Sequence, residues 1–333
     1  MTLRVGVIGA GIMGADHVNT LQRMVSGAEV SMVADVGLGR AQSVADPIGA
    51  RATDDGYVLI DDDAVDAVVI ASHDSTHAGL AIAAIAAGKP VLCEKPLAPT
   101  LAECVRVVQT EEATVGDGVP LISLGFMRRF DPGYLQLKQA LGDGSIGRPL
   151  VVHNISRGVS SGPGTSNESS VTGSAIHEFD LLPWLLGSPI TEVSWQAPRA
   201  STEAAGFQDP QVMLLRTADG VLSTLEVFLN ARYGYDVRCE VVGEQGTLAL
   251  TEPTRLVTDL RRARSAGYPA DWRPRFADAY RIELQEWTDA VVAGAPSPLA
   301  TAYDGLVAAA VADAVITSMR DGGRFVAVQV PDS

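Results

Sequence analysis

Leu3-Arg4-Val5-Gly6-Val7-Ile8 runs directly into Gly9-Ala10-Gly11-Ile12-Met13-Gly14, so an apolar strand is followed by a glycine-rich turn and a helix. In such a turn, Gly9 permits the tight bend and Gly11 lets the backbone approach a pyrophosphate, while Gly14 lets the helix pack close to the strand. The pyrophosphate would lie on the positive N-terminus of the helix. This stretch predicts a dinucleotide-binding βαβ unit, against the alternative of an ordinary glycine-rich loop.

An acidic residue follows at the distance that such a unit requires. Residues 29–34 are typical of a second strand, and this strand ends at Asp35, about 20 residues beyond the glycine turn. A carboxylate here can accept both ribose hydroxyls of NAD and would repel the 2′-phosphate of NADP. Val36 and Gly37 add no base, and Arg40 is the nearest cation. We therefore expect NAD rather than NADP.

Composition limits the class of protein. A chain of 333 residues is long enough for two domains. Its formal charge of -15 argues against nucleic acid or an anionic membrane as partner, because either needs a basic face. Cys93, Cys104 and Cys239 are widely spaced and form no C-x-x-C pair. We expect reduced, mostly buried thiols, a cytoplasmic location and no membrane span.

Strand and helix patterns alternate through the first third of the chain, as in parallel βαβ units. Thr100 and Glu103 have the spacing of a helix capping box. Further strands are expected at 65–71, 90–93 and 120–124, and helices at 38–45, 76–87 and 100–113. The pattern predicts a doubly wound parallel sheet, a Rossmann domain, over residues 1–124.

The pattern changes after Gly125. Helices are expected at 131–141, 173–186, 276–292 and 302–319, and strands at 149–156, 192–196, 212–217, 221–228, 235–242 and 247–250. Strands joined by tight turns predict an α/β domain over 125–333 whose large, mostly antiparallel open sheet has helices on one face. We expect an exposed apolar sheet face, suited to oligomerisation, formed by Val212, Leu214, Leu225 and Val227.

Glu94-Lys95-Pro96 follows directly on an apolar strand, which places Lys95 at the carboxyl edge of the parallel sheet. Ligands bind at this edge in open α/β folds. A lysine there can donate hydrogen bonds to a substrate hydroxyl and stabilise the alkoxide that develops as hydride leaves. The alternative is a surface lysine in a turn.

His177 begins the segment His177-Glu178-Phe179-Asp180 on an expected helix. Its ordinary pKa suits the removal of a hydroxyl proton near neutral pH, although a helical histidine is more often structural. Asp180, three residues on, shares a helix face with His177 and could orient the ring, or it could form a salt bridge nearby.

Other polar residues lie near the same predicted sheet edge. His73 and His77, next to Ser72, resemble half of a metal site but lack an evident third ligand, so contact with the nicotinamide end of a cofactor is favoured. We expect no metal. His17 is expected to pack in the core.

Arg128 and Arg129 form a basic pair that could bind a polyhydroxylated ligand or could instead pair with local acids such as Asp131. Tyr233 and Tyr235 alternate across Gly234, and this spacing predicts that both rings face one side of a strand. Either core packing or a hydroxyl contact with a sugar-like ligand would explain them.

Taken together, these blocks resemble the family of glucose-fructose oxidoreductase, inositol dehydrogenase and rhizopine catabolism proteins, over essentially the whole chain. Within that family, the chain most resembles the bacterial inositol dehydrogenases. The matching blocks are Gly9–Gly14, Asp35, Cys93-Glu94-Lys95-Pro96-Leu97, Gly125-Phe126-Met127-Arg128-Arg129, His177-Glu178-Phe179-Asp180 and Tyr233-Gly234-Tyr235-Asp236.

The resemblance implies that NAD accepts hydride from a carbinol flanked by Lys95 and His177, the two catalytic residues. It also implies substrate contacts from Arg128 and Tyr235, to which Asp180 is added as a candidate, and an open sheet that often forms the interface of a tetramer. The residues expected to bind the cofactor are Gly9, Gly11, Ile12, Met13, Gly14, Asp35, Val36, Ser72, His73, His77, Glu94 and Lys95.

The sequence departs from inositol dehydrogenases at two positions. Gly173 stands where these enzymes usually have an aspartate one turn before the catalytic histidine, and Gly158 stands where they tend to have an asparagine. A missing partner can leave a substrate hydroxyl or pocket group unpaired, at a cost of roughly 1–3 kcal/mol. We expect a preference that has moved from myo-inositol toward another isomer, a pyranose or a substituted polyol.

These observations support a hypothesis of NAD-dependent oxidation of a secondary alcohol on a cyclic polyol, to a ketone or lactone. Two alternatives are an NADP-dependent sugar or dicarbonyl reductase of the same fold and a non-catalytic, nucleotide-sensing regulator. Asp35 argues against the first, and Lys95 together with His177 argues against the second.

Overall fold

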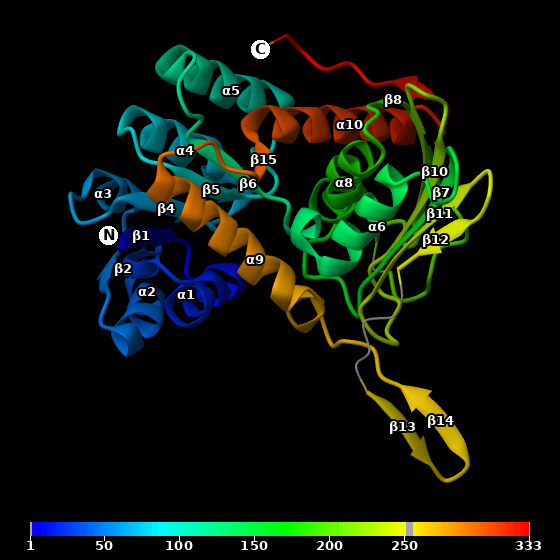
Figure 1. The fold of residues 1–333 in the computed structure, drawn as a ribbon, viewed down its shortest axis with the longest axis horizontal. Coiled ribbons are helices and arrows are strands. Elements are labelled where there is room, and N and C mark those ends of the chain that lie inside the picture. The colour runs from blue at the N-terminus through cyan, green and yellow to red at the C-terminus, as the bar shows by residue number, and fades with distance from the viewer. Residues whose placement is uncertain (1, 205, 251–255, 333) are drawn as a thin grey trace. The chain divides into compact units, whose positions relative to one another are not determined.

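The computed structural model describes residues 2–204, 206–250 and 256–332, which divide into two compact units (Figure 1). Unit 1 comprises Met1–Met127, Asp278–Ala309 and Pro331–Ser333, and unit 2 comprises Arg128–Ala277 and Ala310–Val330. The last third of the chain therefore contributes to both units, whereas the sequence pattern assigns all of 125–333 to one domain.

Unit 1 is built on a seven-stranded sheet with the strand order β15-β6-β5-β4-β1-β2-β3. Strands β1 to β6 run parallel, and β15 adds an antiparallel edge. The strands are β1 (Leu3–Ile8), β2 (Ala28–Ala34), β3 (Arg51–Thr53), β4 (Ala67–Ile70), β5 (Val91–Glu94), β6 (Ile122–Gly125) and β15 (Ala300–Thr301). The order 3-2-1-4-5-6 confirms the predicted doubly wound Rossmann sheet, whose switch point lies between β1 and β4.

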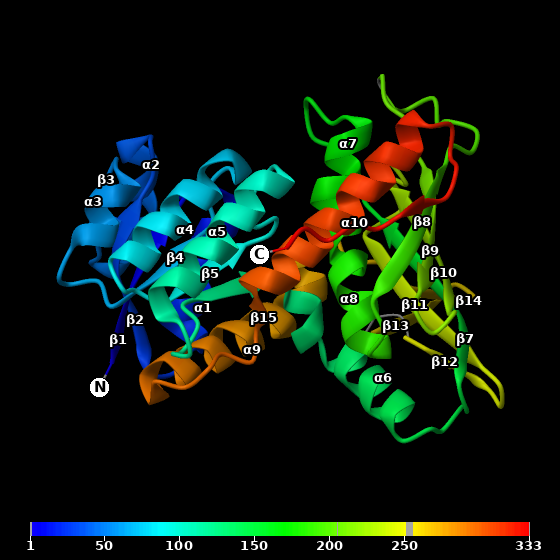
Figure 2. The ribbon, with the colours of Figure 1, turned by 90° about the horizontal axis from the view of Figure 1, so that it is seen from above.

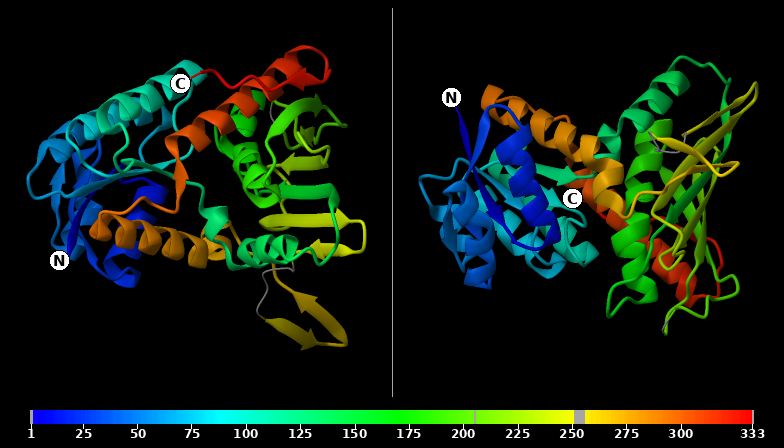
Figure 3. Two further views of the ribbon diagram at one scale, coloured as in Figure 1. Left: turned by 45° about the horizontal axis from the view of Figure 1, so that its top comes forward. Right: turned by 90° about the horizontal axis from the view of Figure 1, so that it is seen from below.

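Helices cover both faces of this sheet. The central strands β4 and β5 are buried along their whole length, as expected for parallel strands covered on both sides. Helices α4 and α5 lie on one face, and α1 lies on the other with the unit 1 part of α9 (Figures 1 and 3). The helices are α1 (Ile12–Met24), α2 (Leu38–Ala45), α3 (Gly56–Asp61), α4 (His77–Ala86), α5 (Leu101–Val115) and α9 (Trp272–Ala293), with short 3-10 turns η1 (Asp46–Ile48), η2 (Asp74–Thr76) and η3 (Met127–Phe130).

Unit 2 contains a second seven-stranded sheet, in the order β12-β11-β7-β10-β9-β8-β16. All neighbours are antiparallel except β7 and β10, which run parallel. The strands are β7 (Pro149–Arg157), β8 (Ile190–Gln196), β9 (Gln211–Thr217), β10 (Leu222–Phe228), β11 (Asp236–Gly243), β12 (Thr247–Ala249) and β16 (Val326–Ala327). The mostly antiparallel sheet is as predicted.

The helices of unit 2 lie on one side of its sheet (Figure 2). They are α6 (Pro132–Gly142), α7 (Asn167–Ser170), the π-helical turn η4 (Val171–Ala175), α8 (Ile176–Leu186) and the second half of α10 (Ala302–Arg320). The α10 helix has the length and hydropathy of a membrane span, but 56% of its most apolar window is buried, so we interpret it as a core helix.

The open face of the unit 2 sheet differs from the prediction at two positions. Val212 and Leu214 are half-buried on the open face, as expected, but Leu225 and Val227 are fully buried on the opposite face. The register explains the error: Leu225 pairs with the buried Met213, whereas its neighbour Thr224 pairs with Leu214. Adjacent residues of a strand face opposite ways, so the expected set mixed the two faces.

An exposed hairpin, β13 (Val257–Leu260) with β14 (Ala263–Ala266), is not predicted by the sequence pattern. Its eight strand residues are all exposed, so it has no alternation of buried and exposed side chains by which to recognise it. Figure 1 shows this hairpin extending from unit 2.

Candidate active site

The three glycines of the first turn have different surroundings in the structure. Gly9 has φ +102°, and a Cβ there would lie 2.4 Å from the carbonyl oxygen of Ala71. A Cβ on Gly14 would lie 1.7 Å from the carbonyl oxygen of Gly9, so only glycine allows α1 to pack this close to β1. At Gly11, a Cβ would meet no heavy atom within 4 Å in the described chain. This opening at the start of α1, where no side chain caps the helix, fits a dinucleotide pyrophosphate.

Asp35 lies beside this turn. Its Oδ2 accepts a hydrogen bond from the backbone N–H of Ala10 (2.9 Å), and its Oδ1 accepts one from that of Gly37 (2.8 Å). Arg40 donates to Oδ1 from Nη2 at 2.6 Å. Burial works to raise the pKa of the Asp35 carboxyl, but these hydrogen bonds outweigh it and lower the pKa. Asp35 is therefore held ionised next to the glycine turn, and Val36 beside it is 89% exposed. The residues present fit NAD.

Lys95 follows β5 at the carboxyl edge of the parallel sheet and is half-buried. The residue before it, Glu94, is buried and accepts a hydrogen bond from Nε2 of His17 at 2.8 Å. The residue after it, Pro96, accepts one through its carbonyl from Nδ1 of His77 at 2.7 Å. The sequence pattern predicts only that His17 packs in the core, and it cannot reveal the link to Glu94 because the two residues are 77 positions apart.

The segment between β4 and α4 does not have the geometry of a metal site. His73 is exposed and its Nδ1 lies 3.0 Å from the hydroxyl of Ser75, whereas His77 is buried with Nδ1 turned to Pro96 and Nε2 3.2 Å from the carbonyl of Ser72. Among the described residues, no group of three or more His, Cys, Asp or Glu side chains could hold a metal ion.

In unit 2, helix α8 carries His177, which is half-buried between buried neighbours. The acids that follow it are bound by the two arginines of η3: Arg128 forms an ion pair with Glu178, and Arg129 forms one with Asp180. Arg129 Nε donates to Asp180 Oδ2 at 2.9 Å. We call these two contacts the arginine pairs. The sequence left a salt bridge of Asp180 open as an alternative, but it did not predict which residues pair in either contact.

Arg128 is almost fully buried, at 2% exposure. Its guanidinium carbon lies 5.6 Å from the ring centroid of Phe276, and its charge faces the hydroxyl of Tyr235. The expected alternative, pairing with Asp131, is wrong. Asp131 instead caps α6 and binds Nη1 of Arg275 at 2.7 Å.

Tyr233 and Tyr235 have different environments, contrary to the prediction that both face one side of a strand. Strand β11 begins only at Asp236, and Gly234 between the tyrosines has φ +151°, so the alternation of a strand does not apply to them. Tyr235 packs edge-on against Phe276, with centroids 6.3 Å apart. Tyr233 packs against Tyr268 and donates from its hydroxyl to Asp236 at 2.5 Å.

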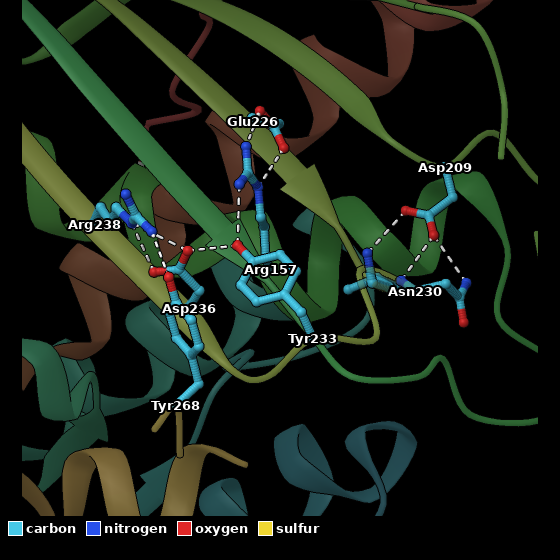
Figure 4. A network of polar contacts seen from close by, with 9 residues as sticks. Arg157, Asp209, Glu226, Asn230, Tyr233, Asp236, Arg238 and Tyr268 are labelled. Atoms are coloured by element: carbon cyan, nitrogen blue, oxygen red, sulfur yellow. Dashed lines mark hydrogen bonds and ion pairs between the residues drawn. The ribbon is translucent and has the colours of Figure 1, made fainter. Parts of the chain in front are cut away.

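The hydroxyl of Tyr233 is part of a polar network on unit 2 (Figure 4). Arg157 donates to it at 3.0 Å and binds Glu226 through two hydrogen bonds of 2.6 and 2.8 Å. Arg238 links Asp236 to the hydroxyl of Tyr268, two residues after the exposed hairpin. The network ties the end of this hairpin to the sheet.

The two glycines at which the sequence departs from inositol dehydrogenases are not equivalent in space. A Cβ added to Gly173 would meet no heavy atom within 4 Å in the described chain, whereas one added to Gly158 would lie 2.9 Å from the carbonyl oxygen of Leu229. Gly173 belongs to the π-helical turn η4, directly before α8. Such turns are frequent at functional sites.

Comparisons with known proteins agree with this architecture. Residues 3–115 match the model of an oxidoreductase family with an NAD-binding Rossmann fold, and residues 134–249 match the GFO/IDH/MocA C-terminal domain. The chain is 55% identical over 325 residues to "Inositol 2-dehydrogenase 2" of Paenarthrobacter aurescens, covering 97% of this chain and 98% of the relative. It is 40% identical to "Inositol 2-dehydrogenase" of Salmonella typhimurium, covering 99% and 98%.

Among solved structures, the myo-inositol dehydrogenase of Lactobacillus casei, in complex with NAD(H) and myo-inositol, superposes with a TM-score of 0.94. It is 34% identical, and the match covers 100% of this chain and 98% of that one. The glycine cradle, the ionised Asp35 and these matches lead to one conclusion: the chain belongs to the GFO/IDH/MocA oxidoreductase family and is an NAD-dependent dehydrogenase.

Proposed function

We propose that this protein oxidises a secondary alcohol of an inositol isomer or a related cyclic polyol, with NAD as hydride acceptor. The observation that carries the proposal is the 55% identity over nearly the full length to an inositol 2-dehydrogenase. It is supported by the opening at Gly11 and by the ionised Asp35, which suit the pyrophosphate and the ribose of NAD. Ile12, Met13, Val36, Ser72 and His73 are proposed as further cofactor contacts.

The proposed chemistry assigns one role to each of two side chains. His177 accepts the proton of the reacting hydroxyl, because an imidazole titrates in the range needed near neutral pH. Lys95 donates a hydrogen bond to the same oxygen and stabilises its developing negative charge. Bound NAD supplies C4 of the nicotinamide as the acceptor of the hydride. Lys95 belongs to unit 1 and His177 to unit 2, so their joint action on one carbinol is part of this proposal.

Arg128, Tyr235 and Asp180 are proposed to line the substrate side of the site. Arg128 and Asp180 also hold an ion pair each, so they would shape the pocket as well as contact a polyol. A hydroxylated ring suits this set, because arginine donates and carboxylate accepts hydrogen bonds.

The proposal is tested by a spectrophotometric screen of NADH formation with inositol isomers, aldoses and lactone-forming sugars. We expect turnover with at least one cyclic polyol and a lower KM for NAD than for NADP. Lys95→Ala should abolish turnover while NAD binding, followed by protein fluorescence, changes little. Wild-type turnover in Lys95→Ala would remove the role assigned to Lys95, and no activity on any polyol would remove the proposed substrate class.

We also propose a homo-oligomer, with a tetramer favoured, that uses the open face of the unit 2 sheet. Half-buried apolar side chains on neighbouring strands support this choice, among them Val212, Leu214, Leu222 and Phe228. Leu214→Asp should shift the mass measured by light scattering to a smaller species, and an unchanged mass would exclude this face.

A cytoplasmic location is proposed as well, supported by three cysteines that are buried and unpaired.

A further inference from the structure

Two buried histidines contact the residues on either side of Lys95. His17, on α1, binds the side chain of Glu94, and His77, the first residue of α4, binds the carbonyl of Pro96. We call these contacts the histidine ties. We propose that His17 and His77 are positioning residues, which fix the turn around Lys95 so that its ammonium group stays aligned with the reacting oxygen. This inference rests on the proposed function, in which Lys95 stabilises the alkoxide.

The tie through His17 has a defined direction. Nε2 of His17 lies 2.8 Å from Oε1 of Glu94, and the side chains of the two residues are 0% and 9% exposed. Nδ1 of His17 is buried without a hydrogen-bond partner in the described chain, so the ring proton belongs on Nε2, where the carboxylate accepts it. The edge of the His17 ring packs against Tyr280, with centroids 5.8 Å apart. The imidazole is therefore held in one orientation.

The structure also keeps the carboxyl group of Glu94 ionised. Burial works to raise the pKa of its carboxyl, but the hydrogen bond from His17 and the nearby charge of Lys95 lower it. An ionised carboxylate only accepts hydrogen bonds, so the donor from His17 satisfies it. The end of β5 is thereby fixed by a contact that does not depend on the sheet.

The tie through His77 acts on the other side of Lys95. Nδ1 of His77 donates to the carbonyl of Pro96 at 2.7 Å, and Nε2 lies 3.2 Å from the carbonyl of Ser72. The ring is 1% exposed. The bond from Nδ1 fixes the backbone after Lys95, and Nε2 faces the loop after β4, where cofactor contacts are proposed.

A lysine needs such support because its side chain is a flexible four-carbon stem. The side chain can adopt many rotamers, but the position of the Lys95 Cα determines which oxygen atoms its ammonium group can reach. A misplacement of about 1 Å at a catalytic group can cost on the order of a hundredfold in rate. The histidine ties therefore predict an effect on turnover.

The proposal is tested by replacing each histidine with glutamine and, separately, with asparagine. The amide nitrogen of glutamine replaces Nε2 of a histidine, whereas that of asparagine replaces Nδ1. His17→Gln retains the donor to Glu94 and His17→Asn removes it. At His77 the pattern reverses, because His77→Asn retains the donor to Pro96 and His77→Gln moves it toward Ser72.

We expect His17→Asn and His77→Gln to lower kcat by about tenfold or more, while His17→Gln and His77→Asn stay within about threefold of wild type. The KM for NAD should change little in the two His17 variants. Glu111→Gln is the matched control: Glu111 is also a buried acid of unit 1, and its Oε1 accepts from the backbone N–H groups of Leu121 and Ile122 at 2.8 and 2.6 Å. Its kcat should match wild type even if its unfolding midpoint falls.

The outcomes separate this inference from the proposed function. Equal kcat values for the asparagine and glutamine variants at either histidine would overturn the role given to that residue, even when Lys95→Ala is inactive. An active Lys95→Ala would overturn both the role of Lys95 and the positioning inference. A drop in kcat for Glu111→Gln equal to that of His17→Asn would show general destabilisation and would also overturn the inference.

Discussion

The turn around Lys95 and the helical turn around His177 are held by different kinds of contact. The histidine ties of unit 1 are single hydrogen bonds, one of them to a neutral backbone carbonyl. The arginine pairs of unit 2 join opposite charges, and the Arg128–Glu178 pair is almost completely buried. Losing one partner of a buried ion pair leaves a charge without compensation and costs about 3–5 kcal/mol, whereas losing one buried hydrogen bond costs about 1–3 kcal/mol. The comparison predicts that changes in unit 2 affect stability most and that changes around Lys95 affect turnover.

The largest effect is expected from Arg128→Met. This change leaves Glu178 buried without its partner and should lower the free energy of unfolding by about 3–5 kcal/mol, measured by urea denaturation. The double variant Arg128→Met/Glu178→Leu should recover much of this loss. If the double variant recovers stability but its KM for the polyol is higher than that of wild type, Arg128 also contacts the substrate. A single variant as stable as wild type would contradict the comparison.

A smaller effect is expected from Arg129→Lys. The ammonium group keeps the charge but cannot form the two-pronged contact of a guanidinium with Asp180, so about 2 kcal/mol should be lost from the free energy of unfolding. Arg148→Lys is a matched control, because Arg148 binds Glu244 with an 85% exposed side chain. Surface pairs of this kind contribute little, so an equal loss in both variants would contradict the role of burial.

Glu94→Gln removes the charge from one histidine tie and should cost about 1 kcal/mol at pH 7. The pKa of Glu94 is lowered in the folded protein, so its ionised form stabilises the fold above the unfolded pKa of about 4.3. This contribution is lost as the pH falls through the lower folded pKa. The difference in unfolding free energy between wild type and Glu94→Gln should therefore shrink in acid. A difference that grows in acid would reverse the sign we assign.

The smallest effect on stability is expected from Gly173→Asp, since there is room for a side chain at this position. The change places a carboxylate one turn before His177 and should alter the ratio of kcat/KM between inositol isomers. Gly158→Asn is the contrasting variant, because the carbonyl of Leu229 occupies its space and a loss of about 1–3 kcal/mol is expected. Unchanged isomer ratios in Gly173→Asp would show that this position does not determine specificity.

Much of unit 1 was predictable from sequence. The helix at 38–45 coincides with α2, and Thr100 caps α5 as expected, through a hydrogen bond from the backbone N–H of Glu103. The short β3 and α3 were missed because they have too few residues for a clear period. The edge strand β15 lies more than 170 positions from its partner β6, so no local pattern could reveal it.

In unit 2 the elements were predicted better than their surroundings. Predicted strands match β8 to β12 within two residues at each end, yet the open face was assigned wrongly at Leu225 and Val227. Alternation along a strand shows that two faces exist but not which one the helices cover. The tyrosines were misread for a related reason, since the strand pattern was extended across Gly234 into a segment that is not a strand.

The sequence by itself determined the glycine turn, the acid at Asp35 and the position of Lys95 at a strand end, because these depend on chain geometry over a few neighbouring residues. Only the tertiary structure decided which partner each buried charge has. His17 meets Glu94 across 77 positions, and Arg128 meets Glu178 across 50. A buried polar group must find a partner, but folding rather than local pattern brings that partner within hydrogen-bonding distance.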